Sequence, residues 1–139
     1  MIILDTNVLS ELMRPTPEPA VVAWLEARPS PDLYTTAVTQ AEILHGILLL
    51  PEGKRRAALQ AAALGLFEQD LAGHVLGFTS HDALPYAQIA ADRRRAGRPI
   101  SHFDAQIAAI ARRNRASVAT RNVNDFVDCG VDIVDPWRA

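Results

Sequence analysis

The sequence predicts an α/β protein made of one domain, residues 1–139, with three α/β/α layers and a central, mainly parallel sheet of about four or five strands. Short apolar runs rich in branched residues alternate with longer segments in which apolar residues recur at helical spacing. That alternation is typical of a parallel sheet covered by helices on both faces. The chain has 139 residues, 49% of them hydrophobic, which suits a single domain with a well-formed core.

The strands are predicted from short apolar or β-branched runs that end at turn residues or acids. The first, Ile-Ile-Leu, comes at the start of the chain, and the others follow at intervals that leave room for a helix between strands. The predicted strands are residues 2–4, 33–36, 75–78, 117–120 and, as a short fifth, 131–134.

The helices are predicted from apolar residues three and four positions apart, and most of them end at proline or glycine. The first stops before Pro15, the second before Pro29 and the third at Pro51, and the alanine-rich segment after Gly53 has strong helix propensity. The predicted helices are residues 8–13, 18–27, 39–50, 53–72, 80–96 and 101–113.

Composition excludes several classes of protein. The single cysteine, Cys129, has no partner for a disulfide within the chain, which favours a reducing compartment. No apolar run approaches the roughly 20 residues needed to span a bilayer, and the sequence opens without a basic leader. We therefore expect a cytoplasmic protein without membrane contact. The formal net charge of −2 does not by itself indicate a nucleic-acid partner.

Four carboxylates stand where predicted strands end or the next helices begin. Asp5 directly follows the first strand, whereas Glu42, Asp104 and Asp125 lie in first turns after later strands or loops. In a parallel sheet these positions share one edge, where ligands bind in open α/β folds. We therefore expect the four acids to meet in one cleft.

Three of these acids also have an ordinary structural explanation. Thr39, Ser101 and Asn122 each precede an acid by three positions, which is the spacing of a capping box. Acids in a first helical turn also complement the helix dipole. Asp5 is different, because an acid at the end of an apolar central strand is costly unless something pairs with it.

As a set, the four acids indicate a metal site. Carboxylates crowded together repel and raise each other's pKa, and a divalent cation removes that penalty. Oxygen-only donors favour Mg²⁺ or Mn²⁺. Such ions polarise a phosphodiester and activate water, so the layout suits hydrolysis of nucleic acid.

Four motifs, taken together, give a family resemblance. They are residues 3–8 (Ile-Leu-Asp-Thr-Asn-Val), 42–46 (Glu-Ile-Leu-His-Gly), 103–109 (Phe-Asp-Ala-Gln-Ile-Ala-Ala) and 119–126 (Ala-Thr-Arg-Asn-Val-Asn-Asp-Phe). The first resembles the opening of PIN domains, and the combination is similar to the VapC toxins. The ending Asp135-Pro136-Trp137 resembles the FitB-like branch in particular. The motifs run in order along essentially the whole chain.

The resemblance implies a single PIN domain acting as a homodimeric, Mg²⁺- or Mn²⁺-dependent endoribonuclease that cleaves RNA, often structured RNA such as tRNA. It also implies inhibition by a VapB-like antitoxin. It assigns metal binding and catalysis to Asp5, Glu42 and Asp104, and supporting roles to Thr6, Asn7 and Thr120.

The match loosens at the fourth acid. Many PIN domains have an aspartate two residues after the threonine that matches Thr120, and here that residue is Asn122. An amide oxygen coordinates weakly and adds no charge, so Asp125 is the candidate for the missing catalytic and metal-binding carboxylate, directly or through water. Whether Asp125 or Asn122 completes the site, and whether one metal or two bind, stay open.

Two other α/β protein classes also place an acid after the first strand. A dehalogenase-type phosphatase needs a second aspartate where Asn7 stands, and a receiver domain needs a lysine near its last strand, whereas Lys54 is the only lysine. Both are therefore poor fits. A catalytically weak PIN domain that binds RNA or a partner remains the serious alternative, because Asn122 departs from the family pattern.

Overall fold

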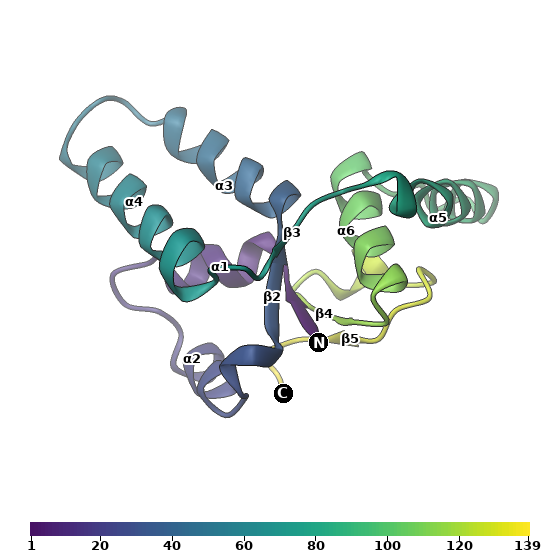
Figure 1. Ribbon diagram of the computed structural model, residues 1–139, viewed down its shortest axis with the longest axis horizontal. Coiled ribbons are helices and arrows are strands. Elements are labelled where there is room, and N and C mark those ends of the chain that lie inside the picture. Colours follow the sequence, from purple (N-terminus) through teal and green to yellow (C-terminus); the bar gives the residue numbers. More distant parts are fainter.

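The computed structural model describes residues 1–139 and contains one five-stranded sheet with all neighbouring strands parallel (Figure 1). The strand order is β3-β2-β1-β4-β5, so the first strand lies at the centre. The predicted fold class is therefore confirmed. The strands are β1 (Ile2–Leu4), β2 (Leu33–Thr36), β3 (Val75–Leu76), β4 (Ser117–Ala119) and β5 (Ile133–Val134).

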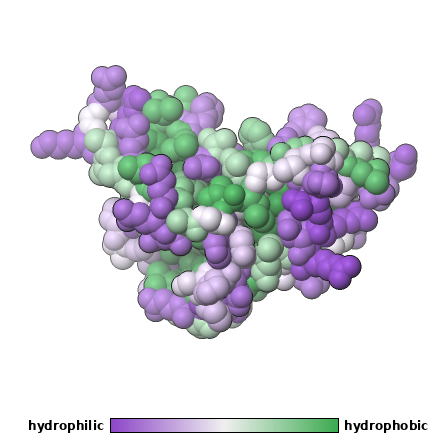
Figure 2. All heavy atoms as spheres, viewed as in Figure 1, coloured by the Kyte–Doolittle hydropathy of each residue, from purple (hydrophilic) through white to green (hydrophobic).

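Six α-helices flank the sheet. Figure 1 shows α3 and α4 as an adjacent pair on one side of the molecule and α5 and α6 on the other. In the space-filling view the surface is hollowed between these two lobes (Figure 2). The helices are α1 (Thr6–Leu12), α2 (Pro19–Glu26), α3 (Ala37–Leu48), α4 (Lys54–Gly65), α5 (Ala83–Arg95) and α6 (His102–Arg113).

Two predicted helices are subdivided. The segment 53–72 does not form one α-helix, because α4 ends at Gly65 and a π-helical turn, Leu66–Asp70, follows. The Leu71 N–H donates to the Leu66 carbonyl at 2.9 Å, and the wider turn leaves both Phe67 and Leu71 buried. The segment 80–96 begins with a 3-10 turn, Ser80–Asp82, before α5 starts.

The two edge strands are shorter than predicted. β3 contributes only Val75 and Leu76, and β5 only Ile133 and Val134. Each edge strand pairs with only one neighbouring strand. The flanking residues therefore lack a second strand whose hydrogen bonds would lengthen the strand.

The core is divided by the sheet into two apolar clusters. Consecutive residues of a strand face opposite sides, so Ile3 packs toward α5 and α6 whereas Leu4 packs toward α1, α3 and α4. Val118 and Ala119 divide in the same way in β4. These strands are therefore buried on both faces, as expected for a parallel sheet. None of the helices has the length and apolar character that crossing a membrane requires.

Candidate active site

The carboxyl ends of β1, β2 and β4 point to one edge of the sheet, and the four predicted acids lie there. Asp5 directly follows β1 and is only 5% exposed. Glu42 is on α3, Asp104 is in the first turn of α6, and Asp125 is in the 3-10 turn Val123–Phe126 that follows β4. The convergence expected from a parallel sheet is thus observed, although the acids are up to 120 residues apart in sequence.

Asp5 is held by a fixed set of donors. Its Oδ1 accepts the Thr6 N–H at 2.8 Å, and its Oδ2 accepts the Thr120 hydroxyl at 2.7 Å and the Asn7 side-chain amide at 3.4 Å. Asn7 also donates to Thr120 Oγ1 at 3.1 Å. These bonds join the ends of β1 and β4 and fix the orientation of the Asp5 carboxylate.

Glu42 is oriented by the same opening motif. The Thr6 hydroxyl donates to Glu42 Oε1 at 3.0 Å. The capping alternative is wrong for Glu42, because Thr36 is the residue that caps α3, through the Thr39 N–H at 3.1 Å. Glu42 therefore lies in the second turn of α3, away from the position at which it would cap the helix.

Helix capping explains one of the other two acids, Asp104, but not Asp125. Ser101 does cap α6, accepting the Asp104 N–H at 3.1 Å, so Asp104 stands at the third helical position. Asn122 makes no side-chain capping bond to the turn that contains Asp125. The Asp125 side chain is exposed, and local helix capping gives no reason for an acid at this position.

These side chains surround one cavity of about 480 Å³. Seven of the eight predicted site residues line it, and the eighth, Thr120, is buried beneath it in contact with Asp5. Nine of the ten residues that line the cavity are polar or charged, which suits an ionic ligand more than an apolar one. The predicted residues that line it are Asp5, Thr6, Asn7, Glu42, Asp104, Asn122 and Asp125.

The carboxylates of this cavity destabilise each other's charge. Burial raises the pKa of Asp5, and the nearby charges of Glu42 and Asp125 raise it further. Burial and the charge of Asp104 raise the pKa of Glu42. The pKa of Asp104 is raised by burial and by the charges of Asp5 and Asp125. Bonds from Thr120, Thr6 and Ser101, and the charge of Arg93 near Asp104, oppose these shifts without cancelling them.

The donor set fits a hard divalent cation. The acidic side chains in the cavity offer carboxylate oxygens, and no histidine or cysteine lines it to offer a softer donor. No arginine or lysine lines it to neutralise the charge. As the side chains stand, no three acidic, histidine or cysteine groups gather closely enough to enclose a metal ion. Mg²⁺ commonly takes only one or two carboxylates and keeps several waters, so direct enclosure by three is not required.

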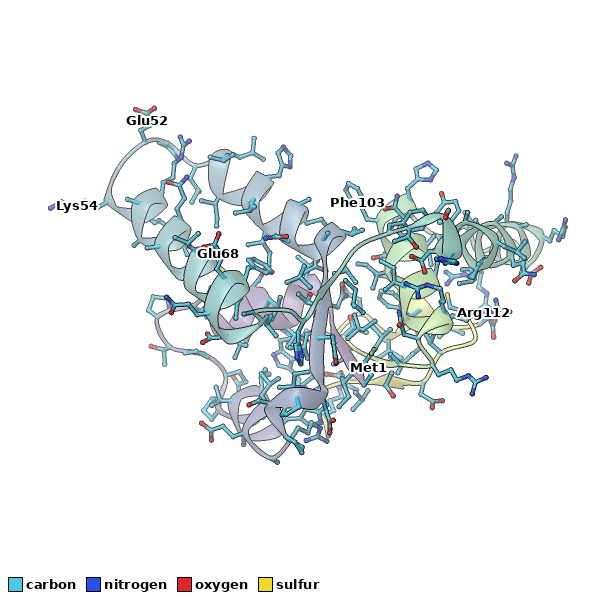
Figure 3. The ribbon with its side chains drawn as sticks, viewed as in Figure 1. Met1, Glu52, Lys54, Glu68, Phe103 and Arg112 are labelled. Carbon is cyan, nitrogen blue, oxygen red and sulfur yellow. The ribbon has the colours of Figure 1, made fainter.

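Several residues at this site were not predicted, among them Ser10 and Ser101, whose side chains also line the cavity. Phe103 lines the cavity and is 53% exposed, and Figure 3 places it at the start of α6, between α6 and α3. Arg93 on α5 is buried and donates through Nη1 to the carbonyls of Asp125 at 2.9 Å and Val127 at 3.0 Å. Its position four residues after Ile89, on the buried face of α5, is a sequence signal that would have identified it.

Comparison with known proteins yields consistent matches. The PIN domain family model matches residues 2–128. The chain is 41% identical over 138 residues to the VapC ribonuclease Y4jK of Sinorhizobium fredii, covering 99% of both chains. It is 40% identical over 142 residues to the toxin FitB of Neisseria gonorrhoeae, again covering 99% of both chains. The crystal structure of FitAcB from the same organism superposes with a TM-score of 0.89 at 39% identity, covering 100% of each chain.

Proposed function

This chain belongs to the PIN-domain family, among the VapC and FitB toxins, and from that premise we propose that it is a metal-dependent endoribonuclease. The resemblance noted in the sequence is confirmed. The observation that carries the proposal is the cavity at the carboxyl edge of the sheet, where four acids from separate segments meet and no basic residue lines the walls. Hydrolysis of RNA phosphodiester bonds is the reaction that this arrangement suits.

In this proposal Asp5, Glu42 and Asp104 hold Mg²⁺ or Mn²⁺, and Asp125 or Asn122 completes the site directly or through water. The bound ion would polarise the scissile phosphate, lower the pKa of the attacking water and stabilise the leaving oxygen. The residues of the chain set the geometry for that chemistry. Support comes from their positions around one cavity and from the raised pKa values of the three acids.

Thr120, Asn7 and Thr6 act as positioning residues. Thr120 and Asn7 bond one oxygen of Asp5, which leaves the carboxylate a defined direction toward the cavity. Thr6 bonds one oxygen of Glu42 and leaves the other free. Outer bonds of this kind orient metal ligands and tune their basicity.

The proposal includes protein partners. A VapB-like antitoxin would inhibit the nuclease, and the active toxin would be a homodimer. Support for the antitoxin comes from the toxin relative and from the FitAcB structure, whereas the homodimer is what the family resemblance implies. The surface also exposes large apolar side chains, as expected of a chain that is covered by partners. They are Met1, Leu44, Leu48, Leu49, Leu64, Phe78, Leu84 and Phe103.

Cleavage of total RNA by the antitoxin-free protein tests the function. With Mg²⁺ or Mn²⁺ we expect discrete fragments that vanish with EDTA and in Asp5→Asn. Asp92→Asn is the matched control, since Asp92 is an exposed aspartate on α5 outside the cavity. Folded protein that binds RNA but does not cut it would favour a PIN domain that acts as a binding module. That is the second candidate function, because Asn122 departs from the family pattern and no three ligands converge closely enough to enclose a metal ion.

A further inference from the structure

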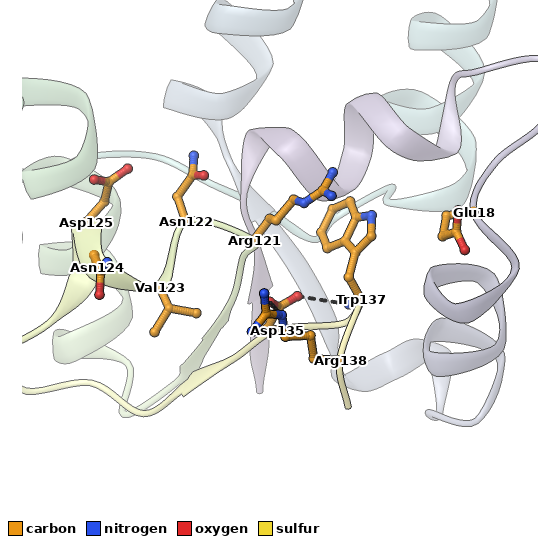
Figure 4. A pocket seen from close by; sticks show the side chains of 9 residues that line it. All are labelled: Glu18, Arg121, Asn122, Val123, Asn124, Asp125, Asp135, Trp137 and Arg138. Carbon is orange, nitrogen blue, oxygen red and sulfur yellow. Dashed lines mark hydrogen bonds and ion pairs between the residues drawn. The ribbon is translucent and has the colours of Figure 1, made fainter.

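A second and larger cavity, of about 1050 Å³, adjoins the acidic cavity. Asn122 and Asp125 line both cavities, so the two share a wall formed by the turn after β4. Figure 4 shows Asn122 and Asp125 at one end of the second cavity, with Arg121 and Trp137 beyond them. A strand of nucleic acid at the acidic cavity therefore has a continuous hollow into which to extend.

Arg121 is held at the junction of the two cavities. Its backbone N–H donates to Asn7 Oδ1 at 3.2 Å, and Asn7 in turn bonds Asp5. The Arg121 guanidinium carbon lies 5.1 Å from the centre of the Trp137 ring, which is cation–π distance. Arg121 forms no ion pair, so its N–H donors remain available to an anionic ligand.

Trp137 is a fixed aromatic surface beneath that guanidinium. It is half-buried against the apolar cluster that contains Leu4, and its backbone N–H donates to Asp135 Oδ1 at 2.9 Å. Asp135 also lies 3.9 Å from Arg138, so its charge already has a cation beside it. Glu18 stands across the cavity from Asn122 and Asp125 (Figure 4). Among the basic side chains of this cavity, Arg121 is the one without a carboxylate partner.

We propose that Arg121 and Trp137 form a nucleotide subsite for the RNA strand next to the scissile bond. Arg121 binds the phosphate that neighbours the scissile phosphate, and the attached base stacks on the aromatic and guanidinium surface. Arginine suits this task because its planar fork of donors matches phosphate, and both aromatic rings and guanidinium planes stack on unpaired bases. The substrate class is therefore RNA that is single-stranded at the cut. The inference rests on the proposed ribonuclease function.

The test compares a hexanucleotide spanning a cleavage site mapped in total RNA with the dinucleotide of the scissile step. In the wild type we expect kcat/KM to rise with length. In Arg121→Gln and Trp137→Leu that gain should fall about tenfold, mainly through KM, as expected when one stacked base is lost. Binding of the same hexanucleotide is measured on the Asp5→Asn protein at several salt concentrations. The slope of the logarithm of the binding constant against the logarithm of the salt concentration should become shallower by about 0.7 when Arg121 is also replaced.

The chain supplies a matched control. Arg28 also lies over a tryptophan, 3.8 Å from the ring centre of Trp24, but in the segment that leads into the start of β2, at the opposite edge of the sheet from the acids. Arg28→Gln therefore removes an arginine–tryptophan contact without touching either cavity. Arg121→Lys should restore part of the gain, because it keeps the charge without the planar fork.

The outcomes separate the two proposals. If the wild type cleaves no RNA with either metal, the ribonuclease function itself is contradicted. If the wild type cleaves but Arg121→Gln keeps the same length gain as Arg28→Gln, the subsite is contradicted and the nuclease stands. Weakened inhibition by the antitoxin, with unchanged length dependence, would assign the cavity to the protein partner and overturn the subsite.

Discussion

Asp5 in the cleft and Asp82 are both buried, yet their surroundings are opposite. Asp82 is completely buried and accepts hydrogen bonds from Arg113 Nε and from the Thr79 N–H, the latter at 2.9 Å. Burial alone would raise the pKa of Asp82, but these bonds and the charge of Arg113 lower it overall. At Asp5 the pKa is raised instead, because burial and neighbouring acids outweigh the bonds that it receives.

The difference separates a structural acid from a candidate functional one. Asp82 closes the capping box that precedes α5 and ties it to the end of α6, so its charge has a partner within the fold. The charges of Asp5, Glu42 and Asp104 have none in their cavity. A protein keeps such a cluster where a ligand from solution supplies the positive charge, which is the basis for proposing a metal ion there.

The largest expected effect is on the structural side of the comparison. Asp82→Ala should lower the free energy of unfolding by about 3 kcal/mol, because Arg113 loses its buried partner and the capping box is broken. Urea denaturation followed by circular dichroism measures the change. Asp92→Asn, an exposed acid in a weak ion pair, should change stability by less than about 0.5 kcal/mol. A similar small change in Asp82→Ala would contradict the structural role.

Arg93, on the helix that follows the Asp82 capping box, anchors the turn that carries Asp125, and its replacement should have the next largest effect. Arg93→Met should lower the free energy of unfolding by about 2 kcal/mol, because the carbonyls of Asp125 and Val127 lose a donor whose own side chain is buried. The loosened turn should also reduce kcat more than KM. Arg94→Gln, an exposed change one residue along α5, is the control. Unchanged kcat in a folded Arg93→Met protein would show that the turn needs no such anchor.

Neutralising Asp5 should act in the opposite direction on stability. Without metal, Asp5→Asn should raise the free energy of unfolding by up to about 1 kcal/mol, because it removes a buried charge that its neighbours repel. The same change should abolish cleavage. Thermal unfolding in EDTA measures the gain. A clear loss of stability in EDTA would mean that the Asp5 carboxylate is itself a structural acid.

The smallest expected effects are in the pH dependence of folding stability, which compares Asp82 with Asp5. The folded pKa of Asp82 lies below the unfolded value of about 3.9, so its contribution is complete above that pH and disappears as the pH falls through the folded pKa. The stability difference between the wild type and Asp82→Asn should therefore be flat near neutral pH and shrink in acid. For Asp5 the folded pKa is raised, so the cost of its ionised form should begin to fall as the pH drops through that value and should be gone below the unfolded value of about 3.9. Urea titrations in EDTA across pH would measure the stability of the wild type minus that of Asp82→Asn, and the stability of the wild type minus that of Asp5→Asn. As the pH falls the first difference should decrease and the second should increase, so a change of the same sign in both would contradict this account.

Much of the site was predictable because it depends on local patterns and one topological rule. Apolar runs located the strands, and parallel pairing brought the residues after β1 and β4 to the same edge. Asp5 followed from an acid placed directly after a buried central strand. Glu42 lies on the helix that follows β2 and Asp104 on the helix that precedes β4, so the alternation of helices with parallel strands accounts for their convergence on Asp5.

What could not be predicted depends on contacts between distant segments. Asp82 has the local pattern of a simple cap, and only the fold brings Arg113, 31 residues later, to its carboxylate. The spacing of Thr39 and Glu42 is that of a capping box at the start of a helix. In the structure the Glu42 carboxylate instead accepts a hydrogen bond from the Thr6 hydroxyl, 36 residues earlier. The π-helical turn after Gly65 likewise follows from the burial of Phe67 and Leu71, which the alanine-rich pattern of the segment did not reveal.

The most direct test of the account is thermal unfolding of the purified protein over a series of Mn²⁺ concentrations. A ligand that binds only the folded state raises stability with its concentration. We predict that Mn²⁺ raises the midpoint of the wild type and of Asp92→Asn, and leaves that of Asp5→Asn unchanged although it starts higher in EDTA. Equal shifts in all three proteins, or none in the wild type, would contradict the claim that the unpaired acids of the cleft are there to bind a metal ion.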